Sequence, residues 1–312
     1  MQFRTKARAV DLLGKGQIAD LPTAITELWK NGYDAYADNL TAEIYLDTYK
    51  DVDSPLFVMT DDGKGMSRND ILEKWLVLGT DSKSRATLEE KESEETLWKK
   101  PRIKAGEKGI GRLSVAFLGN PMLMLTKKQG HPLQAVFFDW RLLENYNLFL
   151  DDVDIPLENI EDISDFASKF KKLKESFLNN FEKENDLDGN LIWEDNQQIL
   201  KTEIENSIKN SVIPNFLSNK LLNNLLDIEN DHGTKFIVFE PIDQIIDITK
   251  NDDVDGLNDR QFIASSLSGF TNEFIKNNKI VNTAIPIFKD VNSTETDFLN
   301  QYGQFFSSDD FD

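Results

Sequence analysis

Three polar side chains lie at helical spacing in the segment 23–39 and could act together on a bound ligand. Glu27, Asn31 and Asp34 occupy positions i, i+4 and i+7, so a helix would place them on the same side. A carboxylate and an amide one turn apart are suited to hold an attacking water next to a magnesium ion. An isolated pattern of this kind is more often a solvated polar face of a helix, so the spacing alone assigns no function.

A second group of residues with chemical potential is the turn DDGKGM at 61–66, which directly follows the apolar run 56–60. Gly63 and Gly65 allow the chain to turn sharply and to approach a flat ligand closely. The Asp61 carboxylate at the strand end can accept a hydrogen bond from a donor such as an exocyclic amine. A plain hairpin turn explains the same residues, because Asp-Gly pairs mark turns.

The third candidate is GEKGIG at 106–111, which opens an apolar helical stretch. Its glycines, Gly106, Gly109 and Gly111, leave a row of bare backbone N–H groups at the positive end of a helix, where phosphates bind well. The motif is not a Walker A loop, because no Gly-Lys-Ser/Thr closes it, and it does not follow a strand as a dinucleotide fingerprint should. By itself, a glycine motif of this kind is weak evidence for a phosphate site.

The fourth candidate is Gly233-Thr234, directly before the strand-like segment KFIVFE at 235–240. A Thr234 hydroxyl in this position can form a hydrogen bond with an acidic side chain or a phosphate. As an isolated pair, the two residues indicate only a turn.

The elements that must position these motifs follow from hydrophobic spacing. The predicted elements are, in order, a short helix within 5–20, an amphipathic helix over 23–39 that starts near Pro22, strands at 42–46 and 56–60, a helix over 70–78, and a hairpin with strands at 122–126 and 134–140. Residues 80–105 are rich in Ser, Lys and Glu and nearly lack aliphatic residues, which predicts a mobile surface loop. Its Lys-rich stretches, 83–91 and 98–104, are interpreted as solvated surface, with the alternative that some of these lysines reach bound phosphates when the loop closes.

The chain changes character after about residue 140. Residues 141–231 are charged and Asn-rich, with helical patches at 166–181 and 199–213, and we interpret this range as a helical insertion. A helix is also expected over 259–275. Within the insertion, 184–195 nearly matches a calcium-binding loop, but the first position should be Asp and the last Glu, and both are exchanged. A plain turn between helices is therefore favoured.

The composition excludes several kinds of site. The 312 residues include no cysteine and only His131 and His232, so thiolate sites and histidine metal sites are not expected. With 55 acidic and 35 basic residues, the net charge of −20 disfavours binding to nucleic acid. No apolar stretch is long enough for a membrane span, and the polar start is unlike a secretory signal, so a cytoplasmic location is expected.

The order of the four motifs resembles that of the GHKL ATPases, a superfamily that includes gyrase, the ninety-kilodalton heat-shock chaperone, histidine kinases and the mismatch-repair protein MutL. ELWKNGYDA, DDGKGM, GEKGIGRLS and HGTKFIVFE are similar to its first to fourth boxes. The resemblance implies the Bergerat ATP-binding fold, an α/β (α+β two-layer) sandwich with a mixed sheet covered on one face by helices. The implied ATP-binding domain comprises 1–140 and 232–288, interrupted by the insertion 141–231 and followed by 289–312 as a tail or the start of another domain.

The same resemblance implies a role for each motif residue. Glu27 would be the general base that acts on the hydrolytic water, Asn31 the magnesium ligand, and Asp34 a supporting polar residue. Asp61 would accept a hydrogen bond from the adenine amino group. The other implied contacts with ATP come from Gly63, Gly65, Met66, Lys83, Gly106, Lys108, Gly109, Ile110, Gly111 and Thr234.

The segment WLVLGTDSKSR at 75–85 is similar to segments of the chaperone-like and MORC-like branch. The implied function is binding and slow hydrolysis of Mg-ATP, coupled to closure of a lid at 80–105 and to ATP-dependent homodimerisation, with a downstream transducer domain supplying a catalytic Lys or Arg. Glu27 favours hydrolysis over a nucleotide-sensing scaffold without turnover. A histidine kinase is disfavoured, because no histidine precedes His131.

Overall fold

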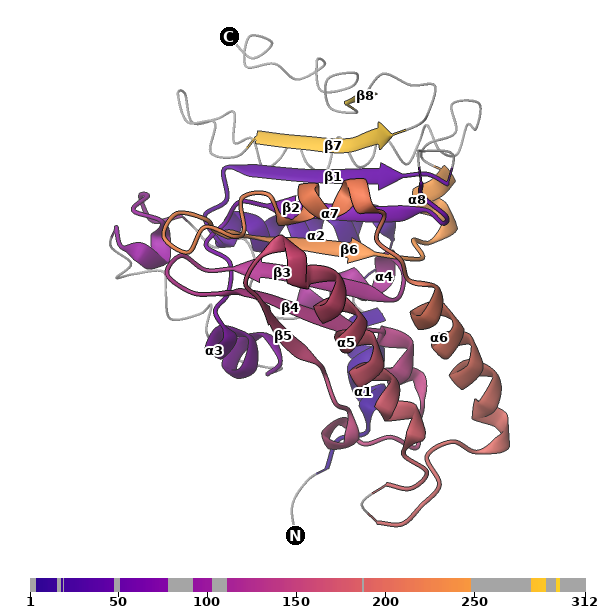
Figure 1. Ribbon diagram of the computed structural model, residues 1–312. Coiled ribbons are helices and arrows are strands. Elements are labelled where there is room, and N and C mark those ends of the chain that lie inside the picture. Colours follow the sequence, from indigo (N-terminus) through magenta and orange to yellow (C-terminus); the bar gives the residue numbers. More distant parts are fainter. Residues whose placement is uncertain are drawn as a thin grey trace.

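A mixed β-sheet forms the centre of the molecule in the computed structural model, which describes residues 4–15, 18, 20–47, 51–77, 92–102, 111–186, 188–247, 282–289 and 296–297 (Figure 1). Its strands are β1 (Asn39–Tyr45), β2 (Leu56–Asp61), β3 (Met122–Lys127), β4 (Leu133–Phe138), β5 (Leu157–Ile160), β6 (Gly233–Val238), β7 (Asn282–Lys289) and β8 (Thr296–Asp297). Their spatial order is β5-β4-β3-β6-β2-β1-β7-β8. From β5 to β1 all neighbours are antiparallel, whereas β1 and β7 are parallel.

The position of β6 between β2 and β3 brings distant parts of the chain together. Asp61, the last residue of β2, is the register partner of Thr234 on β6. Thr126 on β3 pairs with Thr234 from the other side. The second and fourth predicted motifs therefore meet at one end of three adjacent strands.

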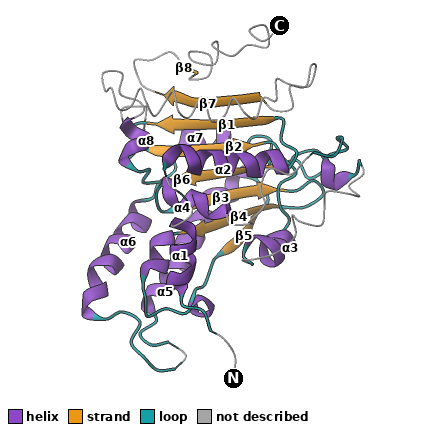
Figure 2. Cartoon of the chain, turned by 180° about the vertical axis from the view of Figure 1, so that it is seen from behind, coloured by secondary structure: helices purple, strands orange, loops and turns teal. Residues whose placement is uncertain are grey.

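Helices cover both faces of the sheet. The described helices are α1 (Ala7–Lys15), α2 (Leu21–Asp34), α3 (Arg68–Asp70), α4 (Val115–Leu118), α5 (Ile163–Glu182), α6 (Gln198–Asn210), α7 (Asn215–Leu222) and α8 (Asp243–Asp247). Figure 1 looks onto the face covered by α5 and α7, and Figure 2 shows the opposite face, where α2 lies. The predicted α/β class with a mixed sheet is confirmed. The expectation of helices on one face needs correction, because β3 and β4 are buried along their whole length and require a second layer.

The start of α2 follows from its sequence. The Asp20 side chain caps the helix by accepting a hydrogen bond from the Thr23 N–H at 2.8 Å, and Pro22 fits the first turn, where no backbone donor is needed. The helix buries a stripe that comprises Leu21, Ala24, Ile25, Leu28 and Trp29. This stripe matches the predicted amphipathic pattern.

The end of α2 lies five residues before the predicted end. The backbone leaves the helix after Asp34, and Tyr36 adopts a left-handed conformation with φ 65°. The Asp62 carboxylate then accepts hydrogen bonds from the N–H groups of Asp38 and Asn39, at 2.7 and 2.8 Å. A distant carboxylate thus determines where the helix gives way to β1.

Most other predicted elements are present with shifted ends. The structure has α1 within 5–20, β1 and β2 at the first two predicted strands, β3 and β4 at the hairpin, β6 at 235–240, and α5 and α6 at the two helical patches. The predicted helix over 70–78 is shorter, because α3 passes into a π-helical turn, Ile71–Trp75. The predicted helix over 259–275 lies outside the described residues, as do 78–91 and 103–110.

An aromatic layer joins α5 to the sheet. Phe137 on β4 contacts Phe170 and Phe177 of α5, with ring centroids 5.9 Å apart in both pairs. Phe170 also stacks on Phe239, which follows β6, at 5.5 Å. Burial of each phenylalanine is worth about 1.5–3 kcal/mol, so α5 is held firmly although it belongs to the predicted insertion. The same range also supplies β5, which extends the sheet beside β4.

The C-terminal end of α7 is fixed to the same face by a buried lysine. The Lys235 Nζ donates hydrogen bonds to the carbonyl groups of Lys220 and Asn223, at 3.0 and 2.9 Å. Lys220 in turn pairs with Glu43 of β1 at 2.5 Å. Burial lowers the pKa of Lys235 to about 8.

The loop 184–195 joins α5 to the segment that leads into α6. The Asp186 carboxylate accepts hydrogen bonds from the N–H groups of Asp188 and Asn190, both at 2.9 Å. These bonds close a turn, which agrees with the favoured interpretation of this loop.

Among the described helices, none is long and apolar enough to cross a membrane.

Candidate functional site

A glycine inside α2 brings this helix into direct contact with the end of β2. A Cβ atom at Gly32 would lie only 2.3 Å from the Leu40 Cδ2 and 3.2 Å from the Asp61 Cβ. A glycine within a helix costs roughly 0.5–1 kcal/mol, and here this cost permits the close approach. The helix that carries Glu27 and Asn31 is thereby held against the β2 end that carries Asp61.

Asp61 is held at the end of β2 by the turn that follows it. One oxygen accepts a hydrogen bond from the Gly63 N–H at 2.9 Å. Burial raises the pKa of Asp61 to about 7, the hydrogen bond from Gly63 opposes the shift, and the charge of Asp62 adds to it. The residue is nevertheless partly exposed at the surface, so a ligand can reach it.

The neighbouring Asp62 has a structural role. Besides the two backbone N–H groups of Asp38 and Asn39, it accepts a hydrogen bond from the Asn39 Nδ2 at 2.6 Å. Its oxygens are therefore occupied by the loop that connects α2 with β1. Of the two adjacent aspartates, Asp61 is the one available to a ligand.

The turn after Asp61 passes very close to β3. Gly65 has φ +60°, and a Cβ atom on it would lie 1.8 Å from the Lys127 carbonyl oxygen, so no other residue fits there. The next residue, Met66, donates its backbone N–H to the Thr126 Oγ1 at 3.0 Å. Met66 is half-buried and packs against the core.

A pair of buried threonines supports this turn from behind. The Thr126 Oγ1 lies 3.0 Å from the Thr234 Oγ1, and Thr126 is fully buried. Thr234 also provides a backbone hydrogen bond that lowers the pKa of Asp61. Sequence reasoning identified Thr234 but missed Thr126, for which the only signal was a hydroxyl residue at the end of the apolar run MLMLT.

The polar residues of α2 differ in their surroundings. Glu27 is half-buried and pairs with Lys30 at 2.6 Å, with both side chains about one-third exposed at 30% and 31%. Asn31 is half-buried, whereas Asp34 is buried. The predicted row is therefore accessible at Glu27 and Asn31, while Asp34 belongs to the interior of the domain.

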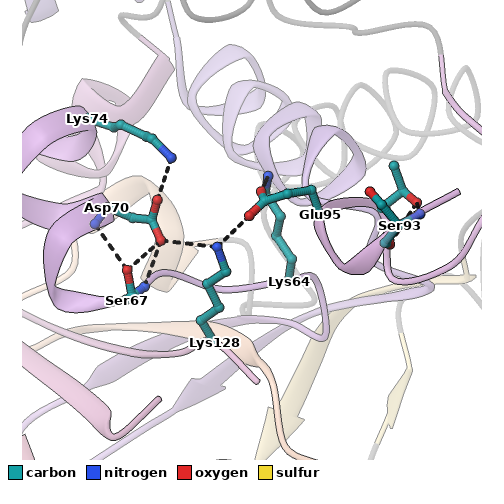
Figure 3. Close-up of polar contacts among 8 residues, drawn as sticks. Lys64, Ser67, Asp70, Lys74, Ser93, Glu95 and Lys128 are labelled. Atoms are coloured by element: carbon teal, nitrogen blue, oxygen red, sulfur yellow. Dashed lines mark hydrogen bonds and ion pairs between the residues drawn. The ribbon is translucent and has the colours of Figure 1, made fainter. Parts of the chain in front are cut away.

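A network of ion pairs connects the DDGKGM turn with the segment 92–102 (Figure 3). Glu95 binds Lys64 of the turn at 2.7 Å and Lys128, just after β3, at 2.5 Å. Lys128 also lies 3.5 Å from Asp70, which accepts hydrogen bonds from Ser67. Burial raises the pKa of Glu95, but the hydrogen bonds from the two lysines outweigh burial and lower it to about 2.

The other end of the same segment is attached to α2. The Lys99 Nζ donates to the Tyr36 carbonyl at 2.7 Å, and the Arg102 guanidinium donates to the Ala37 carbonyl at 2.7 Å. Arg102 also lies over the Tyr33 ring, 5.1 Å from its centroid. The interpretation of 98–104 as solvated surface is thus wrong for Lys99 and Arg102, because cations bind favourably to the carbonyl groups at a helix C-terminus.

Several predicted phosphate contacts lie outside the described residues, namely Lys83, Gly106, Lys108, Gly109 and Ile110. Gly111 is the first residue of a 3₁₀ turn, Gly111–Ser114, which leads into α4 as the third motif predicts. In the part of the chain that the structure describes, no three His, Cys, Asp or Glu side chains are arranged to hold a metal ion.

Residues 19–170 match the family described as histidine kinase-, DNA gyrase B- and HSP90-like ATPases. The matched range contains Glu27, Asn31, Asp61 and the third motif. Thr234 lies beyond it, and the pairing of β6 with β2 connects this residue to Asp61 independently of the match. No curated protein shows a match to the chain.

Proposed function

Because the chain belongs to the GHKL superfamily of ATP-binding domains, we propose that it binds Mg-ATP between α2 and the DDGKGM turn and hydrolyses it. The observation that carries this proposal is the setting of Asp61. Its carboxylate is partly buried, is oriented by the Gly63 N–H, and lies at the end of β2 against α2. A partly desolvated acceptor of this kind discriminates strongly between donors and acceptors on a ligand.

The adenine amino group is the donor that fits this acceptor. An amino group presents two N–H donors, and the Asp61 carboxylate, which accepts hydrogen bonds from the backbone N–H groups of Gly63 and Thr234, has further lone pairs for the ligand. Guanine has a carbonyl group where adenine has the amino group, and a carboxylate repels a carbonyl oxygen. We therefore propose selectivity for ATP over GTP, supported by Thr234 and Thr126 behind the turn.

Magnesium would be held by Asn31 together with the phosphates. The described residues contain no cluster of acidic side chains that could hold the ion alone. This is compatible with Mg²⁺, which retains several waters and usually takes few protein ligands when substrate phosphates supply the rest. When bound, the ion neutralises charge on the phosphates.

Glu27 is the proposed general base. It lies one helical turn before Asn31, and its carboxylate is accessible. Lys30 binds this carboxylate at 2.6 Å, so Glu27 must exchange this partner for a water before it can accept a proton. Partly exposed ion pairs contribute little, about 0–1 kcal/mol, so the exchange costs little.

The segment 92–102 is the described part of the proposed ATP lid at 80–105. Its ends are attached to the DDGKGM turn through Glu95 and to α2 through Arg102. Both attachment points belong to the proposed nucleotide site. Closure of the lid and ATP-dependent dimerisation are proposed from the family resemblance.

A second candidate function is a nucleotide sensor that binds ATP without useful turnover. The observation that favours it is the ion pair between Lys30 and Glu27, in which Lys30 binds the carboxylate of the proposed base. The alternative differs from the ATPase only in the chemical step, so one experiment separates the two.

The experiment compares phosphate release and ATP affinity in the wild type and in Glu27→Ala, with Lys30→Ala as the control that frees the carboxylate. For an ATPase, Glu27→Ala keeps the affinity and reduces turnover by roughly 10²-fold, as expected for loss of a general base, whereas Lys30→Ala stays active. Equal phosphate release by the wild type and Glu27→Ala would instead support the sensor.

A further inference from the structure

The structure contains a cavity of about 360 Å³. Its lining residues come from four segments: α1, the end of the π-helical turn Ile71–Trp75 with the residue that follows it, the 3₁₀ turn Gly111–Ser114, and residues 138–155. None of Glu27, Asn31, Asp61 and Thr234 lines it. The functions proposed above therefore leave this cavity unexplained.

The wall of the cavity is apolar and rich in aromatic rings. Trp140 packs edge-on against Phe138, with centroids 4.7 Å apart, and against Trp75, at 6.5 Å. The aliphatic residues Leu113 and Leu143 complete this wall. The volume falls in the range of small-molecule sites, roughly 300–1,000 Å³, whose walls are also mainly apolar with a few placed polar groups.

Among the described residues that line the cavity, the two charged ones are both negative. Asp154 is already paired with Lys183 at 2.7 Å. Asp151 is exposed, and within the described ranges its carboxylate has no hydrogen-bond or ion-pair partner. An apolar wall beside one uncompensated carboxylate favours a ligand with an apolar part and a positive charge, because the wall excludes water and the carboxylate attracts cations.

We propose that this cavity binds a small organic cation, an aromatic or branched aliphatic amine with a single positive charge. The apolar part would lie against Trp75, Trp140 and Phe138, and the ammonium group would face Asp151. A neutral molecule of the same shape gains the apolar contact but not the charge interaction. An anion is repelled by Asp151 and by the net charge of −20.

The position of the cavity connects it to the nucleotide site. Trp75 ends the helical turn that follows the DDGKGM motif, and Leu113 lies two residues after Gly111 of the third motif. A ligand in the cavity touches both. Resting on the proposed ATPase function, we infer that the cation and ATP change each other's affinity, and such a coupling is reciprocal by thermodynamic linkage.

Binding is tested without nucleotide, by calorimetry and ligand-observed NMR with three indole probes: tryptamine as the cation, tryptophol as the neutral analogue and indole-3-acetate as the anion. We expect tryptamine to bind about 5-fold or more tightly than tryptophol, and indole-3-acetate to bind weakest. In Asp151→Asn this preference for tryptamine disappears. Glu203→Gln, which removes an exposed carboxylate on α6, leaves the preference intact.

A second variant fills the cavity. Val153→Phe places a larger side chain at a half-buried lining position and should abolish binding of all three probes, whereas Ile199→Phe, at a 72% exposed position, should not. Equal affinity for the three probes, or tryptamine binding that persists in Val153→Phe, would overturn the proposal. Because no nucleotide is present, these results are independent of whether the chain binds ATP. An unchanged ATP affinity with saturating tryptamine would overturn the coupling alone.

Discussion

At the scale of single residues, the titration of Asp61 has a consequence for stability. Its pKa in the folded protein, about 7, lies above the ordinary value of 3.8. Between these values the folded chain keeps the proton and the unfolded chain releases it, so the free energy of unfolding falls as the pH rises through this window. At a pH above this window, the negative charge of Asp61 at the proposed site therefore lowers the stability of the folded protein.

The variant Asp61→Asn does not titrate at this position, so its stability relative to the wild type should increase as the pH rises from about 4 to about 7. Other titrating groups are common to both proteins and cancel in the difference. Urea unfolding at several pH values measures it. A difference that stays constant over this range would show that the pKa of Asp61 is not raised.

Thr126 carries a second prediction at this scale. Thr126→Val leaves the Met66 N–H without its acceptor and removes the hydroxyl partner of Thr234. A buried unpaired donor costs about 1–3 kcal/mol, so the variant should be less stable by this amount and should bind ATP more weakly. Thr126→Ser keeps the hydroxyl and should retain the ATP affinity. If the two variants bound ATP equally, Thr126 would not position the site.

At the scale of elements, hydrophobic spacing was sufficient for α2, β2, β3 and β4, because each has a regular buried stripe or run. The ends were less predictable. The end of α2 depends on Asp62, which lies in another element, and the hydroxyl pair of Thr126 and Thr234 depends on strand pairing between residues far apart in sequence. Glu95 bridges lysines of two further segments. Contacts between distant segments of this kind leave no local pattern in the amino-acid sequence.

The ion pairs of Glu95 predict how firmly the segment 92–102 is held. Glu95→Gln weakens both ion pairs, each worth about 0.2–1 kcal/mol at an exposed position, so cleavage within 92–102 by a protease should be roughly 2–30-fold faster. Glu94→Gln, at the adjacent exposed residue, is the matched control. A non-hydrolysable ATP analogue should slow cleavage in all three proteins. Identical cleavage rates for Glu95→Gln and the wild type would show that this network does not hold the segment.

At the scale of the whole molecule, the segment predicted as an insertion is part of the core. Its charged, Asn-rich composition suggested a separate unit, because the apolar residues of α5 are spaced among many polar ones. The structure shows that these apolar residues form the aromatic layer on the second face of the sheet. The domain boundaries themselves stay predictions.

This aromatic layer implies that α5 and the sheet unfold together. Phe177 is fully buried and contacts Phe137, Phe138 and Phe181. Phe177→Ala should therefore lower the free energy of unfolding by about 3–5 kcal/mol in one cooperative transition. Ile199→Ala, at an exposed position on α6, should cost less than about 0.5 kcal/mol. A separate early transition for α5 would indicate an independent insertion.

The central claim is that Asp61 recognises the adenine of ATP, and calorimetric titration of Mg-ATP into the wild type and Asp61→Asn tests it most directly. Asparagine keeps the shape but presents a donor toward the amino group, and a mispaired polar contact costs about 1–3 kcal/mol. We predict that the variant loses roughly 10-fold or more in ATP affinity and that the wild type prefers ATP to GTP, whereas the exposed control Asp53→Asn binds normally. Unchanged ATP affinity in a folded Asp61→Asn protein would contradict the account.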